Sequence, residues 1–235
     1  NIGTDREALG TAVHGKGSGY TIHTVFGFGT PIITPIEEMP EETRMLFEYN
    51  PELAKKMLAD AGYPDGFDME LVIRGAGGVS EYENHGSVLA SQWAKIGVNV
   101  NLKVLEAVAH AAIRGTSHDY DDGFMFDTSH APPEMPRMMS DGEYPADFDD
   151  PHYDELVTRA MKIAAPAERD ALLKEAALYF VNEASWLPTP ASTSFLGWWP
   201  WLKNYYGELE AGYTDTTPMH ATLWIDQGLK KQMGY

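Results

Sequence analysis

The chain has 235 residues, of which 43% are hydrophobic, so it can bury a sizeable core in one domain or in one and a half. Its net charge of −18 argues against nucleic acid and anionic membranes as partners, because their phosphates would be repelled, and fits a solvated acidic surface. The absence of cysteine excludes disulfides, thiolate zinc sites and cysteine nucleophiles, and it is compatible with an exported protein.

No hydrophobic run approaches the roughly 20 residues that are needed to span a bilayer. The opening residues, NIGTDREALGTAVHGKG, have the pattern of a helix and its glycine-rich exit rather than that of a signal peptide. We therefore expect the sequence to be a piece of a longer protein, in which case the missing leader says nothing about localisation.

Two helices are predicted in the first quarter of the chain. Residues 4–14 form the first, and a loop rich in glycine and proline follows it to residue 40. The second begins at Asn50 as N-cap, with Pro51 at its first position, and ends at Gly62 in the left-handed conformation. Its expected apolar face consists of Leu53, Met57, Leu58 and Ala61.

A strand, a helix and a strand come next, which predicts a two-layer α/β lobe. The first strand is MELVIRG (69–75), and the helix over 83–96 ends at Gly97. On this helix Trp93 is expected in the core rather than in a cleft. The second strand is VNVNLKVLE, in which apolar and polar residues alternate, so one side should be buried: Val98, Val100, Leu102 and Val104.

The remaining elements follow from the same signals. We predict a short helix over 107–114, a strand over 120–126, and helices over 151–164 and 166–183, the first of them capped by Asp150. Residues 186–206 hold four of the six tryptophans among prolines and β-formers. This composition indicates extended segments that pack on an aromatic surface.

The densest group of possible metal ligands lies in HDYDDGFMFDTSH, residues 118–130. Alternation on a strand places Asp119 and Asp121 on one face and Asp122 on the other, so these carboxylates should not converge on an ion. Neither GxSxG nor HExxH occurs, and there is no Walker phosphate loop. A pair of carboxylates acting in glycan hydrolysis remains the alternative function, because an acidic chain offers many such pairs.

Four passages resemble the C-terminal part of a family 5 extracellular solute-binding protein. They are TDREAL, YNPELAKKMLADAGYPDGFDMEL, SQWAKIGVNVNLKVLE and DPHYDELVTRAMKIAAPAERDALLKEAALYFVNEASWLPTP, which together cover most of residues 4–190 in the family's order. The second and fourth passages are the specific ones. The ending, from WWPWLKNYYG to TLWIDQGLKKQMGY, resembles one subgroup less specifically.

The resemblance implies an α/β fold, namely a type II periplasmic binding protein lobe with a mixed sheet flanked by helices, in a fragment of a two-lobed protein. Residues 1–195 would be the distal ligand-binding lobe, and residues 196–235 would return toward the missing first lobe. The implied function is that of the substrate-binding component of an ABC importer, which captures an oligopeptide or an oligosaccharide-like solute and delivers it to the permease. We expect no catalysis, no cofactor, a monomer, and a periplasmic or extracellular location, with a lipid anchor on the full-length protein.

The segment after the strand over 120–126 should face the cleft, because ligands gather beyond the carboxyl ends of strands. It contains Phe126, Asp127, Ser129 and His130. In peptide-binding members, as the resemblance implies, this loop supplies an aspartate that pairs with the ligand's amino terminus. An ungapped alignment places His130 or Ser129 at that position, and Asp127 could replace it only in a reshaped loop.

A buried ammonium group needs a carboxylate partner, so this departure favours a neutral ligand, such as an oligosaccharide, or a modified peptide. Sugar faces could stack on aromatic rings such as those of Phe126 and Tyr82. The loop after the first strand adds Arg74, which could hold a ligand carboxylate or pair with a neighbouring glutamate.

Overall fold

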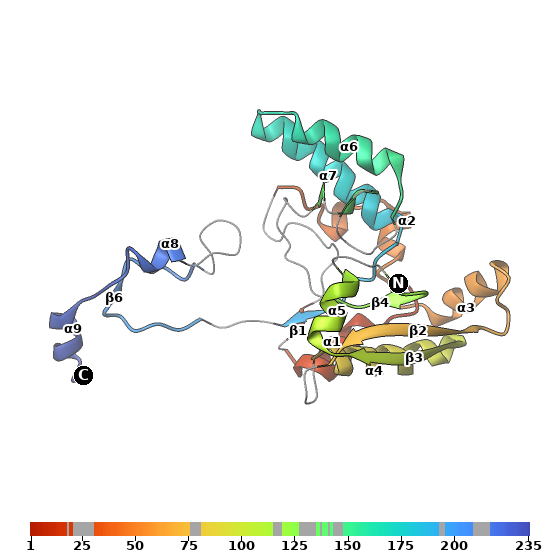
Figure 1. The fold of residues 1–235 in the computed structure, drawn as a ribbon, viewed down its shortest axis with the longest axis horizontal. Coiled ribbons are helices and arrows are strands. Elements are labelled where there is room, and N and C mark those ends of the chain that lie inside the picture. The colour runs from red at the N-terminus through yellow and green to blue at the C-terminus, as the bar shows by residue number, and fades with distance from the viewer. Residues whose placement is uncertain are drawn as a thin grey trace. The chain divides into compact units, whose positions relative to one another are not determined.

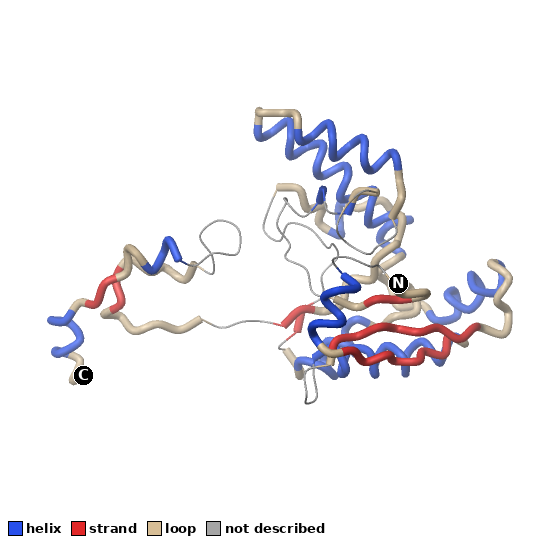
Figure 2. Tube along the Cα trace, in the orientation of Figure 1, coloured by secondary structure: helices blue, strands red, loops and turns tan. Residues whose placement is uncertain are grey.

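The structure is a computed structural model that describes residues 1–17, 19–20, 31–75, 81–114, 119–126, 135–136, 138–140, 142, 148–192, 196–208 and 217–235 (Figures 1 and 2). The chain divides into two compact units, Asn1–Ser192 and Thr193–Tyr235. Their roles as a ligand-binding lobe and a returning tail remain predictions.

A three-stranded parallel sheet forms the centre of the first unit. Its order is β3-β2-β4, with bounds Phe67–Arg74 for β2, Val98–Leu105 for β3 and Gly123–Phe124 for β4. Helix α4 (Glu81–Trp93) and the 3-10 helix η2 (Ala94–Ile96) connect β2 to β3, and α4 packs along both strands (Figure 1). Helix α5 (Ala107–Ala112) follows β3. The predicted strand, helix and strand are therefore confirmed.

The two long strands are buried to different degrees. Leu71, Val72 and Ile73 are buried in succession, as expected for the central strand of a parallel sheet. On β3 the predicted alternation is confirmed as far as Leu102, but Val104 is 49% exposed. The prediction was wrong there because β3 lies at the edge of the sheet and is covered only in part.

Asn50 caps its helix as the sequence predicts, and the first helix, predicted from residue 4, begins at Arg6 after a cap that the sequence analysis did not name. Asp5 caps α1 (Arg6–His14) by accepting from Ala8 N at 2.9 Å, and Asn50 caps α3 (Pro51–Asp60) by accepting from Leu53 N at 3.0 Å. The exit of α3 passes through Gly62, whose φ is +98°.

The predicted apolar face of α3 is confirmed only in part, because Leu53 and Leu58 are half-buried but Ala61 is exposed. Its buried residue is Ala54, whereas Met57 is 49% exposed. A Cβ on Gly3 would lie 2.6 Å from Ile96 Cδ1 and 3.6 Å from Ala54 Cβ, so the contact that covers this helix is small and centred on Ala54. A face chosen by hydrophobicity alone cannot anticipate which side meets a neighbour.

A helical hairpin supplies most of a hydrophobic core cluster in the first unit. It consists of α6 (Pro151–Met161) and α7 (Pro166–Asn182), which lie side by side, with the short helix α2 (Glu41–Met45) against α7 (Figure 1). Alanines at positions 160, 176 and 177 let the helices approach closely. Tyr153 is fully buried beside Phe180 and donates its hydroxyl hydrogen to Met135 O at 3.0 Å.

Arg6 is buried, with only 4% of its surface exposed. It connects parts of the first unit that are far apart in sequence. Its guanidinium donates to Asn1 Oδ1 at 2.6 Å, to Leu46 O at 3.4 Å and to Pro188 O at 3.3 Å, and it lies over the ring of Phe47. Burial lowers the pKa of Arg6 to about 10, which still leaves it charged at neutral pH.

Hydrogen bonds from Thr4 and Asp5, which precede Arg6, join the same N-terminal segment to α4. The backbone of Asp5 exchanges two hydrogen bonds with the Gln92 side chain, at 2.8 and 3.0 Å. The indole of Trp93 donates to Thr4 Oγ1 at 2.9 Å. The TDREAL passage therefore connects the sheet layer to the segment that returns from α7.

The short elements complete the two units. The first unit also contains β1 (Gly19–Tyr20) paired antiparallel with β5 (Ala191–Ser192), and η1 (Ile36–Glu38). The second contains β6 (Leu202–Lys203) paired with β7 (Trp224–Ile225), α8 (Thr217–His220) and α9 (Gln227–Gln232). There the rings of Trp199 and Trp201 stack at 4.5 Å, as the aromatic composition predicts. Among the described helices, none is long and apolar enough to cross a membrane.

Gly66 fixes the start of the parallel sheet. Its φ is +79°, and an added Cβ would overlap the carbonyl oxygen of Gly97, which accepts from Phe67 N. We predict that Gly66→Ala lowers the free energy of unfolding by at least about 2 kcal/mol, measured by urea denaturation. Gly62→Ala is the matched control, because its φ is also positive but no atom lies within 4 Å, so about 1 kcal/mol is expected. Equal losses in both variants would contradict the steric argument.

Asp150 caps α6 and is also bonded to α7. It accepts from His152 N at 2.8 Å, from Tyr153 N at 3.0 Å and from the Tyr179 hydroxyl at 2.7 Å. Burial raises the pKa of its carboxyl group, but these hydrogen bonds outweigh burial and hold the pKa below its usual value. The same contact raises the pKa of Tyr179 to about 12.

We predict that Asp150→Ala lowers the free energy of unfolding by about 1 to 2 kcal/mol at neutral pH. Because the carboxyl pKa is lower in the folded state, this stabilisation is present above the unfolded pKa of about 3.9 and is lost as pH falls through the folded value. Urea denaturation at about pH 7 and about pH 3 should therefore show the difference shrinking in acid. Asp150→Asn, which keeps a capping oxygen, should lose less and respond less to pH. A difference that is equal at both pH values would refute this role.

Candidate functional site

A cavity of about 310 Å³ lies between the sheet, α4 and the segment that follows α7. Five aromatic side chains contribute to its wall, together with aliphatic and small residues; the lining residues are Met69, Leu71, Leu89, Trp93, Tyr120, Asp122, Gly123, Phe124, Met125, Phe126, Ser185, Trp186, Leu187 and Thr189. A concave, mainly apolar surface with few polar groups is typical of a small-molecule site.

The strands place their side chains in this wall by simple alternation. Met69 and Leu71 are two positions apart on β2, so they project from the same face of the sheet. Gly123 pairs with Leu71, and an added Cβ there would lie 3.0 Å from Met69 Cε and 3.1 Å from Leu71 Cδ1. The missing side chain lets β4 pair closely with β2, and Phe124 and Phe126 follow directly.

Ring contacts hold Phe126 in position. It packs on Phe124 at 5.7 Å and edge-on against Trp186 at 4.9 Å, measured between ring centroids. Trp186 in turn packs on Phe180 in the core of the helical hairpin, at 5.7 Å. The aromatic side chains of the cavity wall therefore contact one another from the sheet to the core of the helical hairpin.

A second series of contacts runs from Phe124 toward the end of β2. His110 of α5 stacks on Phe124 at 4.4 Å, and its Nε2 lies 2.8 Å from Met125 O. Tyr82 meets His110 edge-on at 6.1 Å, and the guanidinium of Arg74 lies 4.6 Å from the centre of the Tyr82 ring. Arg74 and Tyr82 thus form a cation–π contact with each other. Neither residue lines the cavity.

The predicted site residues divide into three groups. Phe126 lines the cavity, and Arg74 and Tyr82 lie close together outside it. Asp127, Ser129 and His130 lie outside the described residues. A ligand-binding role for any of the six remains a prediction.

Sequence reasoning missed several residues that the fold brings to the cavity. Trp93, expected in the core, is half-buried and contributes to the wall, and Trp186 joins it from the far end of the unit. The only sequence feature that marked these two residues was the aromatic side chain itself. An aromatic residue at a helix end or in an extended segment does not predict which residues it will contact. His110 does not line the cavity but stacks on Phe124, and it was missed because a lone histidine in a short helix predicts no contact.

In the segment over 118–130, the carboxylates of the described residues 119–126 do not converge on a common point. Asp122 Oδ2 accepts from Glu70 N at 2.7 Å, which ties its carboxylate to the backbone of β2. Another group of titratable side chains, His14, Glu81 and His85, lies close together elsewhere, and none of the three lines the cavity.

Residues 1–176 match the family described as "Bacterial extracellular solute-binding proteins, family 5 Middle". The chain belongs to this family. Its members bind solutes rather than catalyse reactions, so the hydrolase alternative has no support. The match also confirms the resemblance that the four sequence passages indicated.

Family 5 relatives with known ligands cover much of the chain. Heme-binding protein A of Haemophilus influenzae is 30% identical over 173 residues, which are 68% of this chain and 30% of that protein. The glutathione-binding protein GsiB of Salmonella typhimurium is 26% identical over 205 residues, 78% of this chain and 38% of that protein. The chain thus spans about a third of the length of these relatives.

Solved family 5 structures share the fold. DppA from Helicobacter pylori, in complex with the peptide STSA, matches with a TM-score of 0.68 at 18% identity, over 97% of this chain and 43% of that one. A dipeptide-binding protein from Pseudoalteromonas in complex with Met-Leu matches with a TM-score of 0.66 at 22% identity, over 81% and 38%. The predicted type II periplasmic binding protein fold is therefore confirmed, and the chain covers less than half of each of these two structures.

Proposed function

We propose that this chain forms part of the solute site of an ABC importer's binding protein, and that its cavity holds the apolar part of a peptide or peptide-like solute. The observation that carries the proposal is the cavity of about 310 Å³ with five aromatic side chains, in a chain of the solute-binding family. Aromatic rings bind apolar groups through large contact areas and lose little conformational freedom on binding.

The chemistry of the cavity narrows the ligand class. Asp122 is the charged residue among those that line it, and its carboxylate is already bonded to the β2 backbone, so the wall offers mainly apolar contact. Peptide side chains meet this requirement, and two of the similar structures contain peptides. The relatives named above bind heme, glutathione or peptides, so the oligosaccharide expected from the sequence becomes a comparison ligand.

The full protein would act by closure of two lobes over the solute, which shifts an equilibrium between open and closed forms. The closed form would dock on the permease of the importer. We further propose a monomer in the periplasm or outside the cell, held there by a lipid anchor.

A ligand screen tests the proposal directly. Thermal unfolding of the full-length protein should be measured with short peptides, glutathione, heme and oligosaccharides, since a ligand at 100 times its Kd adds about 2.7 kcal/mol of stability. We predict an upward shift with peptides, and we predict that Phe126→Ala weakens that binding about tenfold through lost ring contact. Phe67→Ala is the matched control, because Phe67 packs on Tyr63 at the other end of β2. A shift with oligosaccharides alone, or equal weakening by both variants, would overturn the proposal.

The loop after β4 gives an independent prediction for the same site. If it faces the ligand, Asp127→Ala or His130→Ala should weaken binding in the full-length protein without changing its unfolding temperature in the absence of ligand. Isothermal titration of each variant with the peptide found in the screen measures this. Unchanged affinity in both variants would contradict the prediction that residues 127–130 face the ligand. It would not affect the proposal that the cavity holds the apolar part of the solute.

A further inference from the structure

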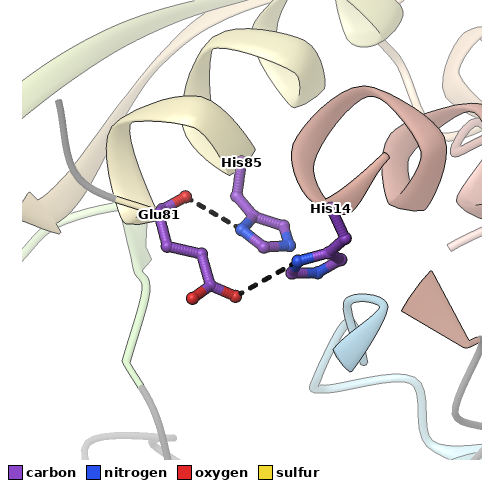
Figure 3. Close-up of side chains that lie close together, drawn as sticks. All are labelled: His14, Glu81 and His85. Atoms are coloured by element: carbon purple, nitrogen blue, oxygen red, sulfur yellow. Dashed lines mark hydrogen bonds and ion pairs between the residues drawn. The ribbon is translucent and has the colours of Figure 1, made fainter. Parts of the chain in front are cut away.

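His14, Glu81 and His85 meet at the ends of two helices (Figure 3). His14 is the last residue of α1, Glu81 is the first residue of α4, and His85 lies one turn further along α4. Residues four apart share a helix face, so Glu81 and His85 project toward the same point. Both histidine side chains are buried, whereas 58% of the Glu81 side chain is exposed.

Each histidine has a ring nitrogen within 3.0 Å of a backbone carbonyl oxygen. His14 Nε2 lies 3.0 Å from Pro190 O, and His85 Nδ1 lies 2.9 Å from Glu81 O. A neutral imidazole has one N–H, and these short contacts assign it to His14 Nε2 and His85 Nδ1. The other nitrogen of each ring, His14 Nδ1 or His85 Nε2, is then a lone-pair acceptor.

These acceptors face other oxygens instead of donors. His14 Nδ1 lies 3.7 Å from Glu81 Oε1 (Figure 3). His85 Nε2 lies 3.4 Å from Pro190 O. Lone pairs that face lone pairs repel, so the arrangement lacks positive charge at its centre. Either a protonated histidine or a bound cation would supply that charge.

The geometry suits a cation. One donor atom from each of the three residues lies within 4.8 Å of the other two. Zinc bonds of about 2.0 Å in a tetrahedron place donors roughly 3.3 Å apart, so the group must contract slightly. The exposed Glu81 side chain can make that movement, while the buried histidines are oriented by carbonyls, as is usual for metal-binding histidines.

We propose that His14, Glu81 and His85 bind a divalent transition-metal ion, with zinc as the best fit to two imidazoles and a carboxylate. Three protein ligands leave a fourth position for solvent. The ion would join the end of α1 to the start of α4, next to Pro190, which precedes β5. The site is separate from the solute cavity, so it does not depend on the proposed function.

Metal titration of the full chain tests this proposal. After chelator treatment, Co²⁺ should bind with one saturable equivalent, give the visible absorption of a tetrahedral ion, and be displaced by Zn²⁺. Glu81→Gln should weaken the binding of both ions about tenfold, and His85→Gln should weaken it about a hundredfold. His220→Ala, which removes an exposed histidine of α8, should change nothing.

Glu81→Gln still tests the metal site if His85→Gln fails to fold. Residue 81 is exposed, so its substitution should leave the fold intact. Zn²⁺ should raise the unfolding temperature of the unmodified protein and raise it less in Glu81→Gln. Absence of saturable binding would overturn the proposal and leave a protonated histidine pair as the explanation. Equal binding by Glu81→Gln and the unmodified protein would also overturn it.

Discussion

The buried guanidinium of Arg6 is the interaction on which the rest of the first unit depends. It spans three segments that are far apart in sequence, because it donates to the side chain of Asn1 and to the backbone carbonyl groups of Leu46 and Pro188. A lysine could not do the same, because only the planar fork of arginine donates in several fixed directions at once. The sheet layer and the helical hairpin are therefore joined by hydrogen bonds at a desolvated centre.

The segment over 184–190 shows the consequence of that connection. Asn1 donates to the carbonyls of Ala184 and Trp186, and Arg6 donates to that of Pro188. The same segment supplies part of the cavity wall and, at Pro190, the carbonyl that orients His14. A stretch without regular structure is thus held by side-chain hydrogen bonds from Asn1 and Arg6, and it contacts both the cavity and the group of His14, Glu81 and His85.

Sequence reasoning succeeded where a signal is local. Asn50 and Asp150 each cap a helix, as predicted, because their own side chains reach backbone groups two or three residues away. It failed where the answer depends on a distant neighbour. Met57 is as apolar as any core residue, yet it is exposed because no other element covers that side of α3 enough to bury it.

The sequence by itself determined the strand, helix and strand of β2, α4 and β3, the two helices of the hairpin and the solute-binding family, since periodicity, caps and family passages are local patterns. It predicted a mixed sheet, whereas the described strands β3, β2 and β4 are all parallel to one another. Only the tertiary structure decided which rings share a cavity and which titratable groups meet. Phe126 and Trp186 are 60 positions apart, and His14 and Glu81 are 67 positions apart, yet each pair is in contact. Such contacts arise from the packing of whole layers around Arg6, and no local pattern encodes them.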